Sequence, residues 1–441
     1  MSSAGPIAVL GSAGGSARAP GVGTSTGTVF RNVPAAEAHV RLRRWWGLRE
    51  CEQNAISGAR RILVLALGGI GDTVLSFAAW RDLRRACPDE HLTALAMWPQ
   101  SAELLEDLGI FDEVLWHNFQ RDSGWRSLCR ALSLRTQRFD VSLLAFPANR
   151  FEYNALAYLL GAGQRWGHKY LRGGDCTYLR FLLTNRIGQQ LGRHVVDENR
   201  ALVAAFTGRA PSEPADIRLG PLHPRYHHRA ARLLAHLDAP LLGIHAGSSM
   251  YKGLAAKRWP AERFGRLCRR AHRELGLQPV VFGAADEIEV KLRIQALCPE
   301  VFFAHGDSIR LTAALIGKCA AFVSNDSGLA HIATAMDVPV VMVCGPTDPG
   351  EVRPYMGSGC VVHAGLDCSP CFRVGRRPMT CTHQTYQACM KRITVGQVLG
   401  AVRSCLHLPE EVSADHEETP GPRANLERRD TDRQPVPAGS A

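Results

Sequence analysis

The sequence predicts an α/β protein built of two doubly wound, Rossmann-like domains that face a central cleft. The chain has 441 residues, of which 46% are hydrophobic, and this is too long for one ordinary core. Short β-branched or leucine-rich runs alternate with longer amphipathic segments in two separate sets. Because parallel sheets bind ligands beyond the carboxyl ends of their strands, we expect the site in the cleft between the domains.

The first set of elements begins with an apolar strand at 62–67 and a helix from about 72 to 86. Strands at 91–96 and 114–116 and a helix near 102–108 follow, and the stretch 147–235 is expected to be mostly helical. The second set contains strands at 241–245, 279–282, 301–304, 321–323 and 339–343, and helices at 261–275, 287–297, 310–318 and 328–336.

The predicted domains are therefore residues 59–237 and 238–408, and both ends of the chain lie outside them. Residues 1–58 form a basic extension whose first part is rich in Gly, Ser and Ala, and residues 409–441 mix charges and prolines without periodicity. Such composition cannot bury a core, so we expect both ends to be disordered.

Charge and cysteine usage limit the class of partner and the compartment. The net charge is +11, and residues 62–409 carry 40 basic and 30 acidic side chains, which suits an anionic partner. No nucleic-acid-binding motif accompanies this charge. Fourteen cysteines lie mostly in apolar stretches at irregular spacing, which favours a reducing compartment. Without a signal-peptide pattern or a run of about 18–20 apolar residues, we predict a cytoplasmic protein.

The first predicted strand runs into a glycine-rich turn that contains Gly68, Gly69, Gly71 and Asp72. Glycines there allow a sharp turn and a close approach to a ligand, and a helix N-terminus favours anionic groups. The turn is neither a dinucleotide-binding fingerprint nor a P-loop. From the pattern alone, Asp72 is either a helix N-cap or a catalytic carboxylate.

Polar residues also follow three strands of the second domain. Ser248 and Ser249 follow the strand at 241–245, and Lys257 and Arg258 come shortly after, a set that could bind phosphate or form a solvated basic loop. Glu287 follows the next strand and could bind ribose hydroxyls or begin a helix.

The densest motif contains Asp326, Ser327, Gly328, Leu329 and His331, between two apolar segments. It brings polar groups to the N-terminus of a helix, where backbone N–H groups can hold a diphosphate. A lone histidine such as His331 is more often a packing residue, but here it would point toward the same rim as the motif.

Four motifs in order carry a resemblance to a known family: ILVLALGGIGD at 62–72, KRWP at 257–260, NDSGLAH at 325–331 and GPTDP at 345–349. Their sequence and spacing are similar to those of glycosyltransferase family 9, the ADP-heptose lipopolysaccharide heptosyltransferases, over about residues 60 to 405. The resemblance implies a GT-B architecture, an N-terminal acceptor domain and a C-terminal nucleotide-sugar domain. It also implies inverting transfer with no metal or cofactor required for catalysis.

The same resemblance implies roles for individual residues. Asp72 resembles the general base that deprotonates the acceptor hydroxyl. Lys257, the backbone of residues 327–329 and the hydroxyls of Ser248 and Ser249 match phosphate-contacting positions. Glu287 matches the carboxylate that holds the ribose, whereas Asp326 and His331 match residues that face the transferred sugar. The only D-x-D in the chain, at 430–432, lies in the C-terminal tail, which agrees with metal-independent chemistry.

Two further features lie outside these motifs. Cys368, Cys371, Cys381 and Cys389 are close enough in sequence to bind a structural zinc or iron, with reduced thiols or a disulfide as the alternatives. Residues 40–48 interleave arginines with two tryptophans, which suits either peripheral contact with an acidic membrane or packing on the folded domains.

The sequence thus predicts an enzyme that moves heptose or a related sugar from an ADP-sugar to a lipopolysaccharide inner-core acceptor at the inner face of the plasma membrane. Its expected partners are a nucleotide-sugar donor and a glycolipid acceptor. The alternatives are transfer to protein, as in autotransporter heptosyltransferases, and a non-catalytic nucleotide-sugar-binding protein. An epimerase of the same fold class is a further alternative.

Overall fold

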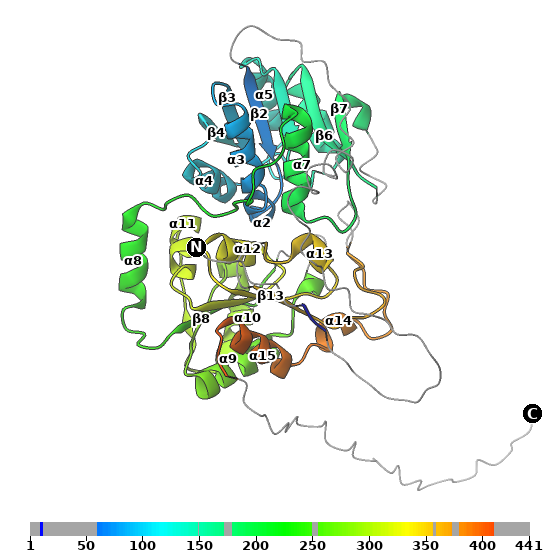
Figure 1. Cartoon of the computed structure of the whole chain (residues 1–441). Coiled ribbons are helices and arrows are strands. Elements are labelled where there is room, and N and C mark those ends of the chain that lie inside the picture. Colours follow the sequence, from blue (N-terminus) through cyan, green and yellow to red (C-terminus); the bar gives the residue numbers. More distant parts are fainter. Residues whose placement is uncertain are drawn as a thin grey trace, which may run out of the picture. The chain divides into compact units, whose positions relative to one another are not determined.

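The computed structural model describes residues 9–11, 60–148, 150–171, 179–248, 255–355, 359–372 and 379–409. These residues form two parallel β-sheets, each covered by helices (Figure 1). We call the sheet of β2–β7 with its helices the first lobe, and the sheet of β1 and β8–β13 with its helices the second lobe. The prediction of two doubly wound units is confirmed.

The sheet of the first lobe has the strand order β4-β3-β2-β5-β6-β7, and all its pairings are parallel. Its strands are β2 (Arg61–Ala66), β3 (His91–Ala96), β4 (Glu113–Trp116), β5 (Val141–Leu144), β6 (Gln164–Lys169) and β7 (Asn185–Gly188). After Arg61 the central strand β2 is apolar to its end, as expected for a strand with side chains buried on both of its faces.

Helices cover both faces of this sheet. They are α2 (Ile70–Val74), α3 (Phe77–Ala86), α4 (Pro99–Asp107), α5 (Gly124–Arg135), α6 (Phe151–Leu159), the 3₁₀ turn η2 (Arg180–Leu182) and α7 (Val195–Thr207). Ile62 and Val64 pack with side chains of α3 and α7, whereas Leu63 and Leu65 pack with those of α5 and α6. Alternate residues of one strand therefore anchor the two helical layers.

Two predictions for this lobe are wrong. The helix expected from 72 to 86 is divided at Ser76, whose hydroxyl donates to the carbonyl of Thr73 (2.7 Å) and accepts from the indole of Trp80 (2.7 Å). The stretch 147–235 is not mostly helical, because it contains β6 and β7. Neither strand carries a continuous apolar run, since β6 is buried only in its middle and β7 is a half-exposed edge strand.

The sheet of the second lobe has the order β1-β13-β12-β11-β8-β9-β10, again with parallel pairing. Its strands are β1 (Val9–Gly11), β8 (Leu241–His245), β9 (Gln278–Val281), β10 (Phe302–Phe303), β11 (Ala321–Asn325), β12 (Val340–Val343) and β13 (Cys360–His363). The short strand β1 comes from the extension that was expected to be disordered. The rest of residues 1–58, with the basic segment 40–48, and the tail from 410 lie outside the described residues.

The helices of the second lobe are α8 (Pro224–Leu234), α9 (Ala261–Leu275), the 3₁₀ turn η4 (Ala285–Glu287), α10 (Ile288–Gln295), α11 (Ile309–Ile316), α12 (Gly328–Ala335), α13 (Pro349–Val352), α14 (Ala388–Lys391) and α15 (Val395–Cys405). One face of the sheet packs against α9, α10 and α15, and the other against α11 and α12. Helix α8 packs on α11. Among the described residues, no helix is both long and apolar enough to span a bilayer.

Candidate active site

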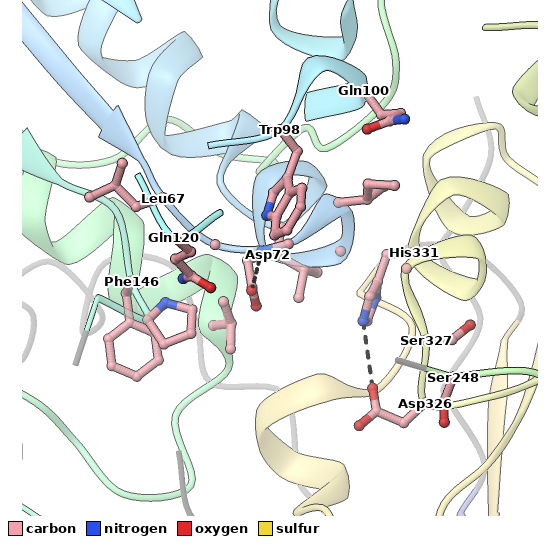
Figure 2. A pocket seen from close by; sticks show the side chains of 18 of the residues that line it. Leu67, Asp72, Trp98, Gln100, Gln120, Phe146, Ser248, Asp326, Ser327 and His331 are labelled. Atoms are coloured by element: carbon pink, nitrogen blue, oxygen red, sulfur yellow. Dashed lines mark hydrogen bonds and ion pairs between the residues drawn. The ribbon is translucent and has the colours of Figure 1, made fainter. Parts of the chain in front are cut away.

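The carboxyl ends of both sheets line one cleft of about 1760 Å³. Residues just after β2, β3, β4 and β5 line it from the first lobe, and residues at or after the ends of β8, β9, β10, β11 and β12 line it from the second. Figure 2 shows Asp72 among Trp98, Gln120 and Phe146, with His331 and Asp326 reaching in from the second lobe. The cleft therefore lies where parallel sheets of this type bind ligands.

Asp72 lies in the first turn of α2 and lines the cleft. Its Oδ2 accepts a hydrogen bond from the backbone N–H of Gly69 (2.9 Å), so the carboxylate does support the start of the helix. Burial raises the pKa of Asp72 to about 6, although the Gly69 hydrogen bond and the charge of Lys257 act in the opposite direction. A carboxylate with this pKa is deprotonated at neutral pH and is more basic than an ordinary aspartate.

Gly71 of α2 and Gly328 of α12 allow the first turns of these two helices to lie against each other. A Cβ on Gly71 would lie 2.9 Å from His331 Cδ2 and 3.2 Å from the Cα of Gly328. A Cβ on Gly68 would lie 2.6 Å from Asp72 Oδ2. Glycine is therefore required at 68 for the carboxylate to fold back, and at 71 for α2 to approach α12 this closely.

Lys257, Asp326 and His331 form a buried polar cluster opposite Asp72. Lys257 Nζ lies 2.7 Å from Asp326 Oδ2, which also accepts from the Thr347 hydroxyl (2.8 Å). Burial alone would raise the pKa of Asp326, but the charge of Lys257 and the hydrogen bonds from Lys257 and Thr347 lower it below its usual value. Asp326 is therefore an anion, and its Oδ1 lies 3.9 Å from His331 Nε2.

His331 lies in α12 and is buried at the rim of the cleft. Burial lowers the pKa of His331 to about 4, with Asp326 acting against this shift, so the imidazole is neutral at physiological pH. Its Nδ1 is buried and has no hydrogen-bond partner among the described residues. A buried ring nitrogen without a partner is costly, which favours a ligand group at this position.

The N-terminus of α12 is available to an anion. Ser327 is the N-cap residue, but its side chain makes no capping hydrogen bond. Its hydroxyl instead lies 2.9 Å from His245 Nδ1 and 2.8 Å from the Ser324 hydroxyl. The first backbone N–H groups of the helix, at Gly328 and Leu329, therefore face the cleft without a side-chain cap.

Glu287 is held from several sides beside this helix start. His245 Nε2 lies 3.3 Å from its Oε2, an Arg258 guanidinium nitrogen lies 3.4 Å from its Oε1, and the N–H of Ala284 donates to Oε2 (3.1 Å). Burial alone would raise the pKa of Glu287, but His245 and these other groups lower it. A Cβ on Gly247 would lie 1.6 Å from Oε1, so only glycine leaves room for the carboxylate.

The predicted serine pair is only partly described. Ser248 is buried, lines the cleft and accepts a hydrogen bond from Arg258 Nε (3.2 Å). Ser249 lies outside the described residues. The structure thus brings Gly68, Gly69, Gly71, Asp72, Ser248, Lys257, Glu287, Asp326, Ser327, Gly328, Leu329 and His331 to the lining of one cleft.

Several lining residues were missed by the sequence analysis. His245 is the last residue of β8 and connects Ser327 to Glu287. In the first lobe, Gln120 donates to the Tyr153 hydroxyl (2.8 Å), and the Arg121 guanidinium lies 5.2 Å from the Trp98 ring. His245 and Trp98 could have been found from the sequence, because each is a polar or aromatic residue at or just after the end of a predicted strand.

The four cysteines predicted to bind metal are described, with Cys368 and Cys371 exposed and Cys389 buried. Burial raises the pKa of the Cys389 thiol to about 11, with Cys371, Cys381 and Cys368 adding to the shift. Within the described ranges, no three His, Cys, Asp or Glu side chains are gathered as a metal would require. As placed, these thiols do not fit a metal ion.

The comparison with protein-family models decides the family. The model of glycosyltransferase family 9 (heptosyltransferase) matches residues 125–381, which is more than half of the chain. The chain belongs to glycosyltransferase family 9. It is therefore a glycosyltransferase, and the predicted family and enzyme class are confirmed.

Named relatives of this glycosyltransferase are heptosyltransferases. Lipopolysaccharide heptosyltransferase 1 of Pseudomonas aeruginosa is 25% identical over 342 residues, which cover 74% of this chain and 88% of the relative. Lipopolysaccharide heptosyltransferase 2 of Salmonella typhimurium is 34% identical over 133 residues, which cover 28% of this chain and 36% of the relative.

A solved structure confirms the fold. The structure of E. coli ADP-heptose lipopolysaccharide heptosyltransferase II has a TM-score of 0.61 at 22% identity, and the match covers 79% of this chain and 98% of that one. The glycosyltransferase therefore has the predicted GT-B architecture of two Rossmann-like lobes.

Proposed function

We propose that this glycosyltransferase moves heptose or a closely related sugar from an ADP-sugar to a lipopolysaccharide inner-core acceptor, with inversion at the anomeric carbon. The first lobe binds the acceptor and the second lobe binds the nucleotide sugar. One observation carries the proposal: Asp72, in the first turn of the helix after the first lobe's central strand, shares a cleft with Lys257 and the uncapped start of α12. The named relatives support the choice of sugar and acceptor.

In the proposed reaction, Asp72 takes the proton of the acceptor hydroxyl as the oxygen attacks the anomeric carbon from the face opposite the nucleotide. The bond to the diphosphate oxygen breaks as the new glycosidic bond forms. The raised pKa of Asp72 supports this role because a base with a pKa of about 6 is both ionised and proton-accepting near neutrality.

Departure of the nucleotide builds negative charge on the diphosphate. Lys257 and the N–H groups of Gly328 and Leu329 line the same part of the cleft and can stabilise that charge. A transferase without a catalytic metal needs such a cation and such N–H donors directed at the diphosphate. Glu287 binds the ribose hydroxyls, and the neutral His331 and Asp326 face the transferred sugar.

The decisive test is release of ADP when the full-length protein is mixed with ADP-heptose and a heptose-deficient lipopolysaccharide core. We expect turnover by the wild type and a loss of about 10²–10⁴-fold in D72N, which removes the base without changing the size of the side chain. D89N, at an exposed turn, is the matched control and should turn over normally.

Each outcome bears on a separate part of the proposal. A wild type that is inert with every nucleotide sugar would contradict transferase activity on these donors. Normal turnover by D72N would contradict only the assignment of the base. Transfer to an autotransporter polypeptide, and not to the glycolipid, would show that the acceptor is a protein.

A structural zinc or iron bound by Cys368, Cys371, Cys381 and Cys389 stays a proposal that would need these thiols to move together. The test is elemental analysis of protein purified without added metal, with a Cys371→Ser variant as the comparison. About one equivalent of metal, lost in the variant, would support it. Folded, active and metal-free wild-type protein would contradict it.

A further inference from the structure

The outer side of α5 carries an exposed apolar stripe that the reaction does not use. Trp125, Cys129 and Leu132 are spaced i, i+4 and i+7, so they lie on one side of the helix. Trp125 is 73% exposed and Leu132 48% exposed. Large apolar groups that share one exposed stripe of a helix indicate an interaction surface.

Arginines surround this stripe. Between residues 121 and 138 the chain has five arginines, and Asp122 is the only acidic residue. The Arg126 guanidinium lies 3.6 Å from Asp122, which leaves the other four arginines without a carboxylate from this segment. Arg121 lines the cleft beside Trp98, so the positive charge near Trp125 comes from the arginines of α5 itself.

The same composition continues onto the neighbouring elements. Arg135 donates to the carbonyl of Leu159 at the end of α6 (3.3 Å), next to Tyr158, which is 50% exposed. The Arg165 guanidinium lies 5.5 Å from the Tyr158 ring and donates through Nε to the carbonyl of Leu182 (2.6 Å). Beside Leu182, Phe181 is 72% exposed.

We call the surface formed by Trp125, Leu132, Tyr158 and Phe181 with Arg126, Arg130, Arg135 and Arg165 the outer face. The same two helices also line the cleft, through Ser127, Leu128 and Ala131 of α5 and Leu156 of α6. The outer face and the first-lobe wall of the cleft therefore belong to one helical layer.

We propose that the outer face docks on the surface of a bilayer that contains anionic lipids. Tryptophan and tyrosine rings favour the boundary between headgroups and acyl chains, and arginine pairs with lipid phosphates while its stem stays in apolar surroundings. A second copy of this chain is a poorer occupant because symmetric pairing would bring the two sets of arginines together. The purpose of docking rests on the proposed function, since a glycolipid acceptor would then lie next to the wall that α5 forms.

The test is co-sedimentation of the full-length protein with sucrose-loaded vesicles of phosphatidylcholine, with or without phosphatidylglycerol. One variant combines W125S with L132S, and a second combines R126E with R130E. The matched control combines R232E with L233S on α8, which is also basic and exposes Leu233. We expect salt-sensitive binding of the wild type to the anionic vesicles, a fall of about ten-fold or more in the partition coefficient of each variant, and no change in the control.

The proposal is overturned if the wild type ignores anionic vesicles, or if both variants bind them as the wild type does. A concentration-dependent dimer that is lost in the W125S/L132S variant, without vesicle binding by the wild type, would assign the face to a second copy instead. Circular dichroism of each variant separates lost binding from lost folding. No turnover is needed in this experiment, so its failure is distinguishable from failure of the proposed transferase activity.

Discussion

Asp72 experiences opposing influences on its protonation. Enclosure in the cleft favours the neutral acid, whereas the N–H of Gly69 and the charge of Lys257 favour the anion, and the result is a pKa of about 6. The nearby Asp326 remains an anion because the Lys257 ammonium lies 2.7 Å from its Oδ2, which also accepts from the Thr347 hydroxyl. Two carboxylates in one cleft are thereby tuned to different tasks.

The pH dependence of transfer follows from this pKa. Because the base acts as the anion, protonation below its pKa removes activity, so kcat/KM should rise with pH through about 6 and then level. The measurement is kcat/KM for the acceptor between mildly acidic and neutral pH. A profile already flat at pH 5 would contradict either the raised pKa or the role of Asp72.

His245 should position the donor site without touching the reacting atoms. A carboxylate can only accept, so His245 Nε2 donates to Glu287 and, in the neutral ring, Nδ1 accepts from the Ser327 hydroxyl. H245L removes both hydrogen bonds. The KM for the nucleotide sugar should rise about 10- to 100-fold, as expected for loss of about 1.5–3 kcal/mol, mainly from the hydrogen bond to the charged Glu287.

A positioning role makes a distinctive kinetic pattern. The KM for the acceptor should stay unchanged in H245L, and H245N, which can keep one of the bonds, should recover part of the donor affinity. H228Q, on the exposed surface of α8, serves as the control. Equal changes in both KM values would indicate general disruption of the lobe instead.

At the scale of elements, the contact between α2 and α12 brings the chemistry of the two lobes together. Both helices follow central strands, and each has a glycine where it meets the other. A Cβ on Gly328 would lie 3.3 Å from the backbone N of Gly71 and 3.4 Å from Ile70 Cβ. A larger residue at either glycine would therefore push the two helices apart and move Asp72 away from the polar cluster of the second lobe.

The variant G71A tests this contact. Its Cβ would meet His331 and Gly328, so we expect kcat/KM to fall by more than ten-fold, while overpacking costs about 1–3 kcal/mol of unfolding free energy. Steady-state kinetics and urea unfolding measure the two effects. The control is G400A, at an exposed position in the middle of α15, where an added Cβ meets nothing within 4 Å. It should stabilise the protein by about 0.5–1 kcal/mol and leave activity unchanged.

The strands that the sequence analysis identified correctly include those with largely apolar sequences, such as β2, β8 and β12, and the predicted helix 261–275 matches the amphipathic α9. The strand β6 was missed because its sequence QRWGHK has no run or alternation that marks a strand. The break between α2 and α3 was missed because Ser76 is compatible with a helix, and only its bonds to Thr73 and Trp80 divide the segment.

At the scale of the whole folded body, one arginine connects the lobes on the side of α4 and α11. Arg310 Nε lies 2.8 Å from Asp107 Oδ2, and a terminal nitrogen lies 2.8 Å from a Glu106 carboxylate oxygen and 3.1 Å from the Glu103 carbonyl. These acidic neighbours raise the pKa of Arg310, although burial acts against them. Three hydrogen bonds to one largely buried guanidinium make this a stronger link than an exposed ion pair.

Removal of this link should destabilise the protein. We expect R310A to lower the free energy of unfolding by about 1.5–3 kcal/mol, because Glu103, Glu106 and Asp107 lose the cation that pairs with them in the described part of the chain. R293A, which removes an exposed pair with Glu262 inside the second lobe, should cost less than about 1 kcal/mol. Urea unfolding at low and high salt measures the free energy of unfolding of both variants. Equal losses in R310A and R293A would show that Arg310 stabilises the protein no more than a surface ion pair does.

The sequence alone determined the fold class, the family and the site motifs, because each depends on local patterns: apolar periodicity, glycines and polar residues at strand ends. Only the tertiary structure decided which of these residues meet. Strands of one sheet end at the same edge, so Asp72, Lys257 and His331, far apart in the chain, share one cleft. The pKa of Asp72, the bridge through His245 and the exposure of Trp125 likewise depend on packing across the fold, which no local pattern encodes.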